Sequence, residues 1–268
     1  MEAYDIVLAA RGKDRLTASD YIKGFVDDFL EFHGDRRFGD DHAIIGGIGT
    51  MNGIPITVIG IEKGKDVKER IYHNFGSAHP EGYRKALRLM KQAEKFHRPI
   101  LCLVDTAGAY CGVESEERGQ GQAIAENLLE LSNLKTPMLS IIIGEGGSGG
   151  ALALAQTDRV WMLDTSYFSV VSPENCANIL WRDSSKASQA ATDLKLAAMD
   201  LYQLHLIDQV YPSLNVDATK EEQKNYMLEF KQHILDEIIL LKKKTVEQLV
   251  EERYEKYRQI GRTTEERV

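Results

Sequence analysis

The stretch Gly144-Glu145-Gly146-Gly147-Ser148-Gly149-Gly150 decides the fold class of this chain. It follows an apolar run over residues 138–143 and precedes a run of alanine and leucine, so a buried strand, a glycine loop and a helix are predicted in that order. The same pattern occurs earlier, where the apolar run 100–104 ends at Asp105-Thr106-Ala107-Gly108-Ala109-Tyr110-Cys111-Gly112 and a helix is predicted to begin at Ser115. Two such units in succession predict an α/β fold with ββα-type layering of parallel strands.

Before these units, the sequence predicts a helical lead-in followed by a hairpin. Aromatic residues at three- and four-residue steps predict one helix over residues 14–38. Asn52-Gly53, a pair favoured in tight type I′ turns, lies between the apolar runs 43–49 and 54–60 and predicts that they form a hairpin. Residues 62–79 are polar and glycine-rich without a clean period, which predicts a loop.

The remaining elements complete one domain. Pro80 fits the first turn of a helix, strands are predicted at 160–163 and 167–171, and Ser172-Pro173-Glu174 is typical of a helix start. Beyond Pro212 the chain is charged and helical in its pattern. We therefore expect a single domain, 1–268, that consists of a helical lead-in (1–42), a core (43–212) and a C-terminal helical segment (213–268).

Composition excludes several classes of function. The chain has 33 lysines and arginines against 41 aspartates and glutamates, so its formal net charge is −8. An acidic chain is a poor default for coating nucleic acid or an anionic membrane, and no apolar run approaches the roughly 18 residues of a membrane span. The first residues carry acids where a targeting peptide carries bases, and the three cysteines show no C-x-x-C pairing. We expect a cytoplasmic protein without a disulfide framework or a metal site of its own.

The glycines of the two loops favour the binding of a negatively charged oxygen by backbone amides. Glycine lets the backbone approach a ligand closely, and the start of a helix presents unpaired N–H groups with a dipole that favours negative charge. Both loops follow predicted strands, at the end of an α/β sheet where ligand sites are usually found. Tight packing between strand and helix would explain one such loop, but two in succession favour a functional site.

Two other chemistries compete with this interpretation. Phosphate-binding motifs fail, because the glycines of 47–53 and 60–66 do not match the spacing of the known phosphate loops. A serine hydrolase is a stronger alternative, since Gly146-Gly147-Ser148-Gly149-Gly150 matches G-x-S-x-G between a strand and a helix. The chain order Ser…Asp…His is available through Ser148 with these partners: Asp193, Asp200 or Asp208, and His205 or His233. However, the density of glycines makes an accidental match easy, so the hydrolase ranks second.

The same two loops carry a resemblance to a known family. Residues 144–153 resemble the signature of the α subunit of bacterial acetyl-coenzyme A carboxylase carboxyltransferase. Residues 105–112, followed by Glu116-Glu117-Arg118-Gly119-Gln120, resemble that family's Asp-Thr-Pro-Gly-Ala-Tyr-Pro-Gly segment. Further matches, in the same order along the chain as far as about Pro212, are Asn74-Phe75-Gly76, residues 80–90 and residues 169–174.

The resemblance implies a fold and a reaction. The fold is the crotonase-like (ClpP-like) spiral of ββα units, here with flanking N- and C-terminal helices. The reaction transfers the carboxyl group from carboxybiotin, on a biotin carrier protein, to acetyl-CoA and gives malonyl-CoA for fatty-acid biosynthesis. A relative that carboxylates another acyl-CoA stays open as an alternative. No side-chain nucleophile and no metal in this chain are implied.

The resemblance also implies site residues. The oxyanion hole for biotin is placed at the amides of Gly108, Ala109, Gly149 and Gly150, with Gly146, Gly147, Ser148 and Tyr110 beside them. Arg84, Lys85 and Arg88 either hold phosphates of coenzyme A or form a solvated helix face, and both interpretations stay open. A valine at position 150 is expected to block the approach of the biotin ring while leaving the fold intact.

The implied partners are a zinc-bearing β subunit, which supplies most of the acyl-CoA site, the biotin carboxyl carrier protein and biotin carboxylase. An α2β2 assembly within the ATP-dependent complex is expected, with activity only in the presence of the β subunit. Three residues depart from the family pattern: Ala107 and Cys111 replace prolines, and Asn175 replaces a glycine. The resemblance does not include the long N-terminal helical extension of many members, which in them helps to hold the partner subunit.

Overall fold

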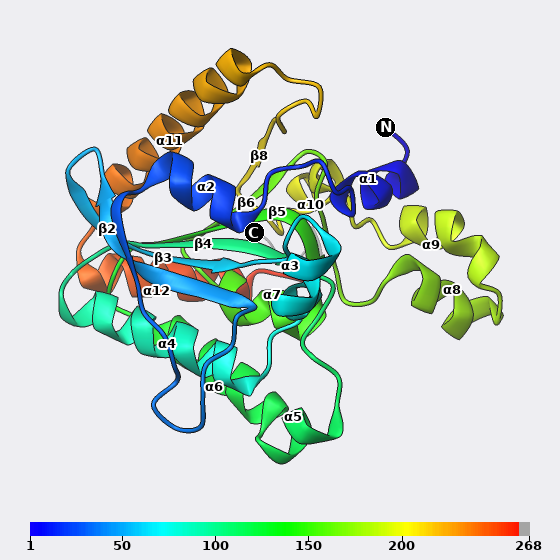
Figure 1. Cartoon of the computed structure of the whole chain (residues 1–268), viewed down its shortest axis with the longest axis horizontal. Helices are drawn as coiled ribbons and strands as arrows, with labels where there is room; N and C mark the ends of the chain where they lie inside the picture. Colours follow the sequence, from blue (N-terminus) through cyan, green and yellow to red (C-terminus); the bar gives the residue numbers. More distant parts are fainter. Residues whose placement is uncertain (263–268) are drawn as a thin grey trace.

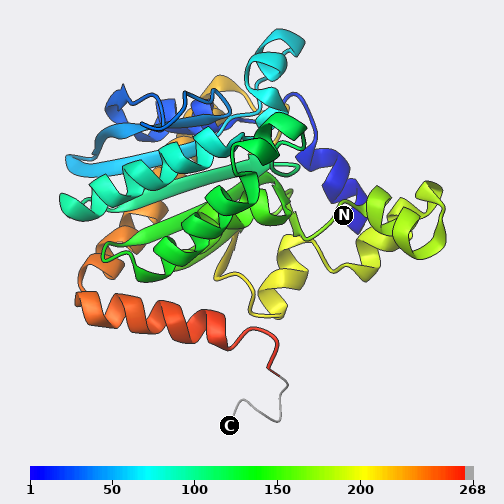
Figure 2. The same ribbon diagram turned by 90° about the horizontal axis from the view of Figure 1, so that it is seen from below.

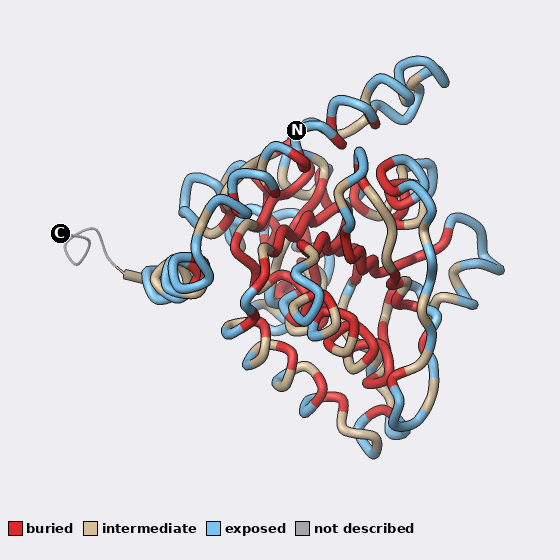
Figure 3. The backbone as a smooth tube through the Cα atoms, turned by 90° about the vertical axis from the view of Figure 1, so that its left-hand side faces the viewer, coloured by how far each residue is buried: buried red, intermediate tan, exposed pale blue. Residues whose placement is uncertain are grey.

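Apolar residues alternate strictly between the two faces of the central strands. The computed structural model describes residues 1–262. In β4 (Ile100–Thr106), Ile100 and Cys102 face one apolar cluster, whereas Leu101 and Leu103 face the other. Because both faces of the sheet are covered, the strand is a continuous apolar run rather than an alternating one. The buried residues gather along the strands and the inner sides of the helices (Figure 3).

The strands are β1 (Asp27–Glu31), β2 (Ile44–Met51), β3 (Ile54–Ile61), β4 (Ile100–Thr106), β5 (Met138–Gly147), β6 (Arg159–Leu163), β7 (Tyr167–Ser169) and β8 (Gln209–Tyr211). The α-helices are α1 (Ala3–Ala10), α2 (Ala18–Phe25), α3 (Val67–Tyr72), α4 (Pro80–Lys95), α5 (Val113–Glu117), α6 (Gln120–Asn133), α7 (Ser148–Ala155), α8 (Pro173–Trp181), α9 (Ala187–Asp193), α10 (Ala198–Gln203), α11 (Lys220–Lys242) and α12 (Val246–Arg258). Two short 3₁₀ helices are η1 (Asn74–Gly76) and η2 (Ser184–Lys186).

The strands form one sheet in the order β1-β2-β3-β4-β5-β6-β8, and β7 pairs with the carboxyl end of β5. The pairs from β1 to β3 are antiparallel, and those from β3 to β8 are parallel. At the turn between β2 and β3, Asn52 and Gly53 have φ angles of 47° and 79°. These positive values fit a type I′ turn, so the predicted hairpin is confirmed.

Helices cover both faces of the sheet (Figures 1 and 2). Residues of α2 and α11 share one apolar cluster, and residues of α4, α6 and α7 share the other. The pair α8–α9 stands beside α1, away from the sheet (Figure 1). Within residues 1–262, no helix has both the length and the apolar character needed to cross a membrane.

The helix predicted over 14–38 is wrong beyond Phe25. Val26 is extended, with φ −113° and ψ 121°, and the chain continues as β1, which pairs with β2. The aromatic spacing that suggested one helix arises because Phe25 lies on α2 while Phe29 lies on β1, and both pack in the same cluster. The lead-in also contains α1, which was not anticipated. The division into 1–42, 43–212 and 213–268 stays a prediction, and residues 263–268 lie outside the described part.

Three further expectations need correction. The loop predicted at 62–79 contains α3 and η1, and Asp66 caps α3 by accepting a hydrogen bond of 2.8 Å from the Glu69 amide. The helix predicted from Ser115 is interrupted at Gly119, whose φ of 82° separates α5 from α6. The strand predicted at 138–143 continues through Gly147, so α7 begins directly after β5.

Candidate functional site

The two glycine segments lie side by side because β4 and β5 are neighbouring parallel strands. A Cβ atom on Gly150 would lie 2.6 Å from the Ala109 amide nitrogen and 3.0 Å from the Gly108 carbonyl carbon. A Cβ on Gly147 would overlap the carbonyl of Ala107. Glycine is therefore required at 147 and 150, because the backbone of residues 107–109 occupies the space of a side chain. The structure brings together the two loops that the sequence singled out.

Both loops present backbone amides at their junction. Gly149 and Gly150 are the second and third residues of α7, where amides have no acceptor within the helix and the helix dipole favours negative charge. In the first loop, the Gly108 amide donates to the Thr106 hydroxyl at 3.0 Å. The Ala109 amide has no hydrogen-bond partner among residues 1–262. Gly108, Ala109, Gly149 and Gly150 do not themselves line the pocket beside this junction, and their role as oxyanion donors stays a prediction.

A pocket of about 530 Å³ opens beside this junction. Ala107 contributes to it from the first loop, and Gly147 and Ser148 from the second. The rest of its wall consists of Arg11, Glu145, Tyr167, Ser169, Val170, Val171, Ser172 and Asn175. Gly146 does not line it, because Gly146 is buried in the pairing between β5 and β7. The wall of the pocket thus includes residues from both glycine segments, from the end of α1 and from the start of α8.

Sequence reasoning missed a network of buried charged residues beneath the loops. The Glu145 carboxylate, 4% exposed, accepts hydrogen bonds from Arg11 Nε at 2.9 Å and from the Tyr167 hydroxyl at 2.6 Å. It also pairs with Lys63. Burial raises the pKa of Glu145, but the charge of Lys63 and the hydrogen bonds outweigh burial and leave the pKa below its ordinary value. Glu145 is therefore ionised at neutral pH.

Arg11 extends the network to the start of α8. Its two terminal nitrogens donate to the Glu174 carboxylate at 2.7 Å and 3.2 Å, a bidentate arrangement that is among the stronger ion pairs. This hydrogen bonding lowers the pKa of Glu174 to about 2. The available sequence signal was weak: Glu145 is a charged residue that lies two positions after the end of an apolar strand run. Its partners lie far away in the chain, and only the fold brings them together.

The basic residues predicted to hold coenzyme A phosphates are largely engaged within the protein. Arg84 pairs with Asp35 at 2.7 Å and with Glu81 at 2.9 Å. Lys85 is buried, with its ammonium group 2.6 Å from Asp40. Arg88 donates to the carbonyl oxygen of Gly34 through Nε and a terminal nitrogen, at 3.2 Å and 3.0 Å. These contacts fasten the segment before β2 to α4 and favour the structural interpretation of Arg84 and Lys85, while their role toward coenzyme A stays a prediction.

Tyr110, predicted beside the oxyanion hole, supports the first loop. Its ring stacks on the His79 ring with centroids 4.0 Å apart. Its amide donates to the Ala78 carbonyl at 3.0 Å, and its carbonyl accepts from the Gln120 side chain at 2.9 Å. Tyr110 therefore holds the loop against α4 and α6.

The structure does not assemble the hydrolase alternative. Ser148 is exposed at the start of α7, but neither His205 nor His233 lines its pocket. His205 lies in another cavity beside Lys256, and the His233 ring packs against Tyr211. Neither of these histidines can therefore serve as the base that would activate the serine hydroxyl. Among residues 1–262, no three or more His, Cys, Asp or Glu side chains cluster as metal ligands would.

Comparisons with known proteins agree with this geometry. Residues 1–261 match the family described as acetyl co-enzyme A carboxylase carboxyltransferase-like. The acetyl-coenzyme A carboxylase carboxyl transferase subunit alpha of Ruminiclostridium cellulolyticum is 55% identical over 265 residues, 99% of this chain and 100% of the relative. The corresponding beta/alpha protein of Natranaerobius thermophilus is 53% identical over 98% of this chain, which matches 43% of that longer protein.

Solved structures extend the comparison to more distant proteins. Transcarboxylase 12S is similar with a TM-score of 0.65 at 18% identity, over 86% of this chain and 44% of the other. The beta subunit of geranyl-CoA carboxylase from P. aeruginosa gives a TM-score of 0.64 at 17% identity, over 88% and 44%. At such low identity the likeness concerns the fold alone, and it confirms the predicted crotonase-like fold class.

Proposed function

This chain belongs to the family of acetyl-coenzyme A carboxylase carboxyltransferase α subunits, and from that membership we propose that its two glycine loops form the biotin side of the transfer site. The substrates are then carboxybiotin, carried on a separate protein, and acetyl-CoA. The bond between biotin nitrogen and the carboxyl carbon breaks, and a new carbon–carbon bond to the acetyl methyl group gives malonyl-CoA. The proton lost by that methyl group passes to the biotin nitrogen.

The amides of Ala109, Gly149 and Gly150 stabilise the negative oxygen that develops on the biotin ring during transfer. One well-placed donor of this kind contributes ~2.7–4 kcal/mol to the transition state. The close approach of the two loops supports this proposal, since a Cβ on Gly150 would lie 2.6 Å from the Ala109 amide nitrogen. The space proposed for the ring is the neighbouring pocket of about 530 Å³, which Ala107, Gly147 and Ser148 of the two loops line.

The proposed partner is a β subunit that carries zinc and supplies most of the acyl-CoA site. The Natranaerobius relative, named as subunits beta/alpha, supports such a partner, because both names belong to one chain there. The biotin carrier protein and biotin carboxylase complete the proposed complex, in an α2β2 arrangement of the transferase, for the synthesis of fatty acids. The location proposed for it is the cytoplasm.

Co-expression with a β-type chain tests this function. The purified complex should exchange the carboxyl group between malonyl-CoA and biotin, and this chain alone should show no exchange and no stoichiometric zinc. Exchange by the chain without a partner, or one tightly bound zinc per chain, would contradict the proposal. Parallel assays with methylmalonyl-CoA and malonyl-CoA decide the alternative of another acyl-CoA, since the preferred substrate has the higher kcat/KM.

A further inference from the structure

The carboxylate of Asp105 joins β4 to β5 at the point where their pairing becomes irregular. Val104 pairs with Ile142, but Thr106 pairs with Gly146, so β5 contains two more residues than β4 between these pairs. Such a bulge leaves backbone groups unpaired and is frequent beside active sites. Asp105 Oδ1 accepts the Glu145 amide at 3.0 Å. The side chain of one strand thus replaces a ladder hydrogen bond of the other.

Arg15 holds this carboxylate from the segment between α1 and α2. Its guanidinium pairs with Asp105 Oδ2, and the two side chains are 15% and 0% exposed. A Cβ on Gly144 would lie 2.5 Å from Asp105 Oδ1 and 2.7 Å from an Arg15 terminal nitrogen. The glycine at 144 is therefore required by the ion pair rather than by a ligand.

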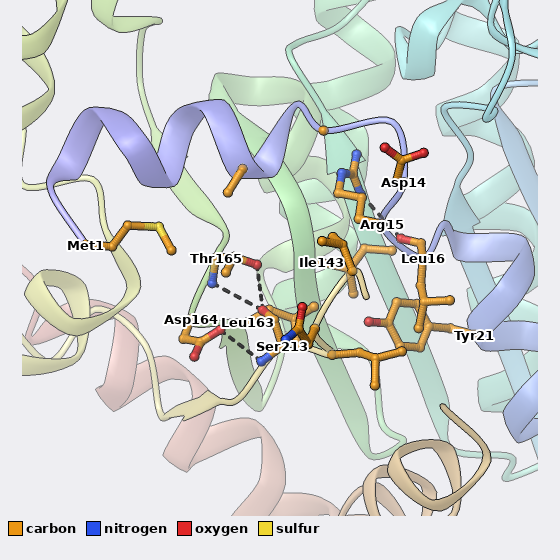
Figure 4. Close-up of a pocket in the computed structure, with 15 residues that line it drawn as sticks. Met1, Asp14, Arg15, Leu16, Tyr21, Ile143, Leu163, Asp164, Thr165 and Ser213 are labelled. Atoms are coloured by element: carbon orange, nitrogen blue, oxygen red, sulfur yellow. Dashed lines mark hydrogen bonds between the residues drawn. The ribbon is translucent and has the colours of Figure 1, made fainter. Parts of the chain in front are cut away.

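Arg15 is itself fixed from the α2 side of the sheet. It lines a second pocket, of about 480 Å³, beside Leu16, Tyr21, Ile143 and Leu163 (Figure 4). One terminal nitrogen of Arg15 donates to the Leu16 carbonyl at 3.4 Å. The guanidinium therefore links the segment between α1 and α2 to the carboxyl end of β4.

We propose that Arg15 and Asp105 are positioning residues that fix the distance between the amide of the first loop and those of the second. Asp105 directly precedes Thr106, whose hydroxyl accepts a hydrogen bond from the Gly108 amide. A shift of Asp105 would therefore shift the backbone of the first loop at Ala109. Glu145, held by Asp105, leads through Gly147 to the start of α7. Neither side chain touches substrate. This inference rests on the proposed function, because it concerns the oxyanion hole that the two loops form.

The chain contains a matched control at the opposite end of β5. Asp158, 4% exposed, accepts the Met138 amide at 2.7 Å and pairs with Arg253, which is 1% exposed, at 2.8 Å. It is a buried aspartate that accepts a β5 amide and pairs with one arginine, as Asp105 does. Asp105 differs in that its Oδ1 also lies 3.9 Å from Lys63 Nζ and that it is close to the loops. Asp158→Asn therefore measures the cost of losing a buried aspartate–arginine pair far from the loops.

The experiment compares Asp105→Asn with Asp158→Asn in the complex with the β subunit, by thermal unfolding and by kcat and KM of malonyl-CoA–biotin exchange. Both variants should unfold at lower temperature. Asp105→Asn should lower kcat by about 100-fold with KM changed less than about threefold, since misplacing one oxyanion donor costs roughly that much. Asp158→Asn should keep kcat within about threefold of the unaltered complex.

Equal values of kcat in the two folded variants would overturn the inference. If Asp105→Asn does not fold, Arg15→Lys keeps the charge but loses the fork of donors. It should lower kcat about tenfold without changing KM, and an unaltered kcat would overturn the inference equally. Failure of the proposed function is a separate result, because the unaltered complex would then show no exchange at all.

Discussion

The amide nitrogen of Ala109 lies 2.6 Å from the position that a Cβ on Gly150 would occupy. The two residues belong to different loops, so a side chain at 150 must move the backbone of the first loop. The Tyr83 hydroxyl, 2.8 Å from the same position, closes the other side. The expectation that Gly150→Val leaves the fold intact is therefore wrong, because the valine displaces the loops before it meets any substrate.

Alanine substitutions at Gly149 and Gly150 distinguish the cost of side-chain overlap from the gain in helix stability in α7. Gly149→Ala meets only the side chain of Ile124, at 3.6 Å, and should raise the free energy of unfolding by up to about 1 kcal/mol, since glycine within a helix is unfavourable by that amount. Gly150→Ala should lower it by about 1–3 kcal/mol through overpacking. Denaturant unfolding of both variants measures the difference. Equal effects would mean that Gly150 does not contact the first loop.

Carboxyl transfer provides a second measurement on Gly150→Ala. The shift of the Ala109 amide should lower kcat of the assembled complex about 100-fold, the effect of losing one oxyanion donor. Gel filtration with the β subunit shows whether the variant still assembles. Near-normal exchange by an assembled variant would place the oxyanion hole elsewhere.

Lys85→Met tests whether the basic residues of α4 serve stability or coenzyme A. The ammonium group is fully buried but its partner Asp40 is 23% exposed, so losing the pair should cost somewhat less than the ~3–5 kcal/mol of a fully buried pair. We expect a large loss of unfolding free energy and an unchanged KM for malonyl-CoA. A KM raised tenfold at little cost in stability would restore the phosphate-binding interpretation.

Acid unfolding should report the pair of Arg11 and Glu174. The pKa of Glu174 falls from its ordinary 4.5 to about 2 in the folded chain, mainly through the hydrogen bond from Arg11. The unfolded chain therefore binds the extra proton first as the pH falls, so the stabilisation is complete above about pH 4.5 and is lost as the pH falls toward 2. In Glu174→Gln, stability should fall less steeply between these values. Glu251→Gln, on the exposed side of α12, is the control and should keep the original slope.

Labelling with a fluorophosphonate tests the hydrolase alternative directly. Neither His205 nor His233 lies in the pocket of Ser148, so its hydroxyl is not activated and no labelling is expected. Ser148→Ala should reduce carboxyl transfer only modestly, through altered packing of the loop. Stoichiometric labelling of Ser148, abolished in the alanine variant, would establish a nucleophile instead.

The sequence predicted the parts of the fold whose pattern is local. The runs that became β4 and β5 are apolar throughout, and Asn52-Gly53 selects its own turn, so neither depends on distant residues. β1 was missed because its side chains are mostly exposed and its conformation depends on pairing with β2. Such an edge strand has no periodicity that distinguishes it from the end of a helix.

The residues of the candidate site could likewise be predicted only where the signal in the sequence is local. The sequence singled out the glycines at 147 and 150 because a cluster of glycines is easily recognised. Only the structure shows that the backbone of residues 107–109 leaves no room for a side chain at these positions. Asp105 and Arg15 were not identified as a pair, since 90 residues separate them and pairing follows only from the approach of α2 to the sheet. Arg84 and Lys85 looked available because a single helix does not reveal the acidic partners that precede β2.

Arg253 on α12 donates to the carbonyl oxygens of Leu131 and Leu134 at 2.7 Å and 2.8 Å, at the end of α6, and pairs with Asp158. During synthesis, those acceptors and that carboxylate emerge from the ribosome long before their partner does. In the folded chain the Asp158 carboxylate is 4% exposed, so it depends on this late partner for a compensating charge. A chain truncated before Val246 should therefore be less stable than the unaltered chain, and denaturant unfolding would measure the difference.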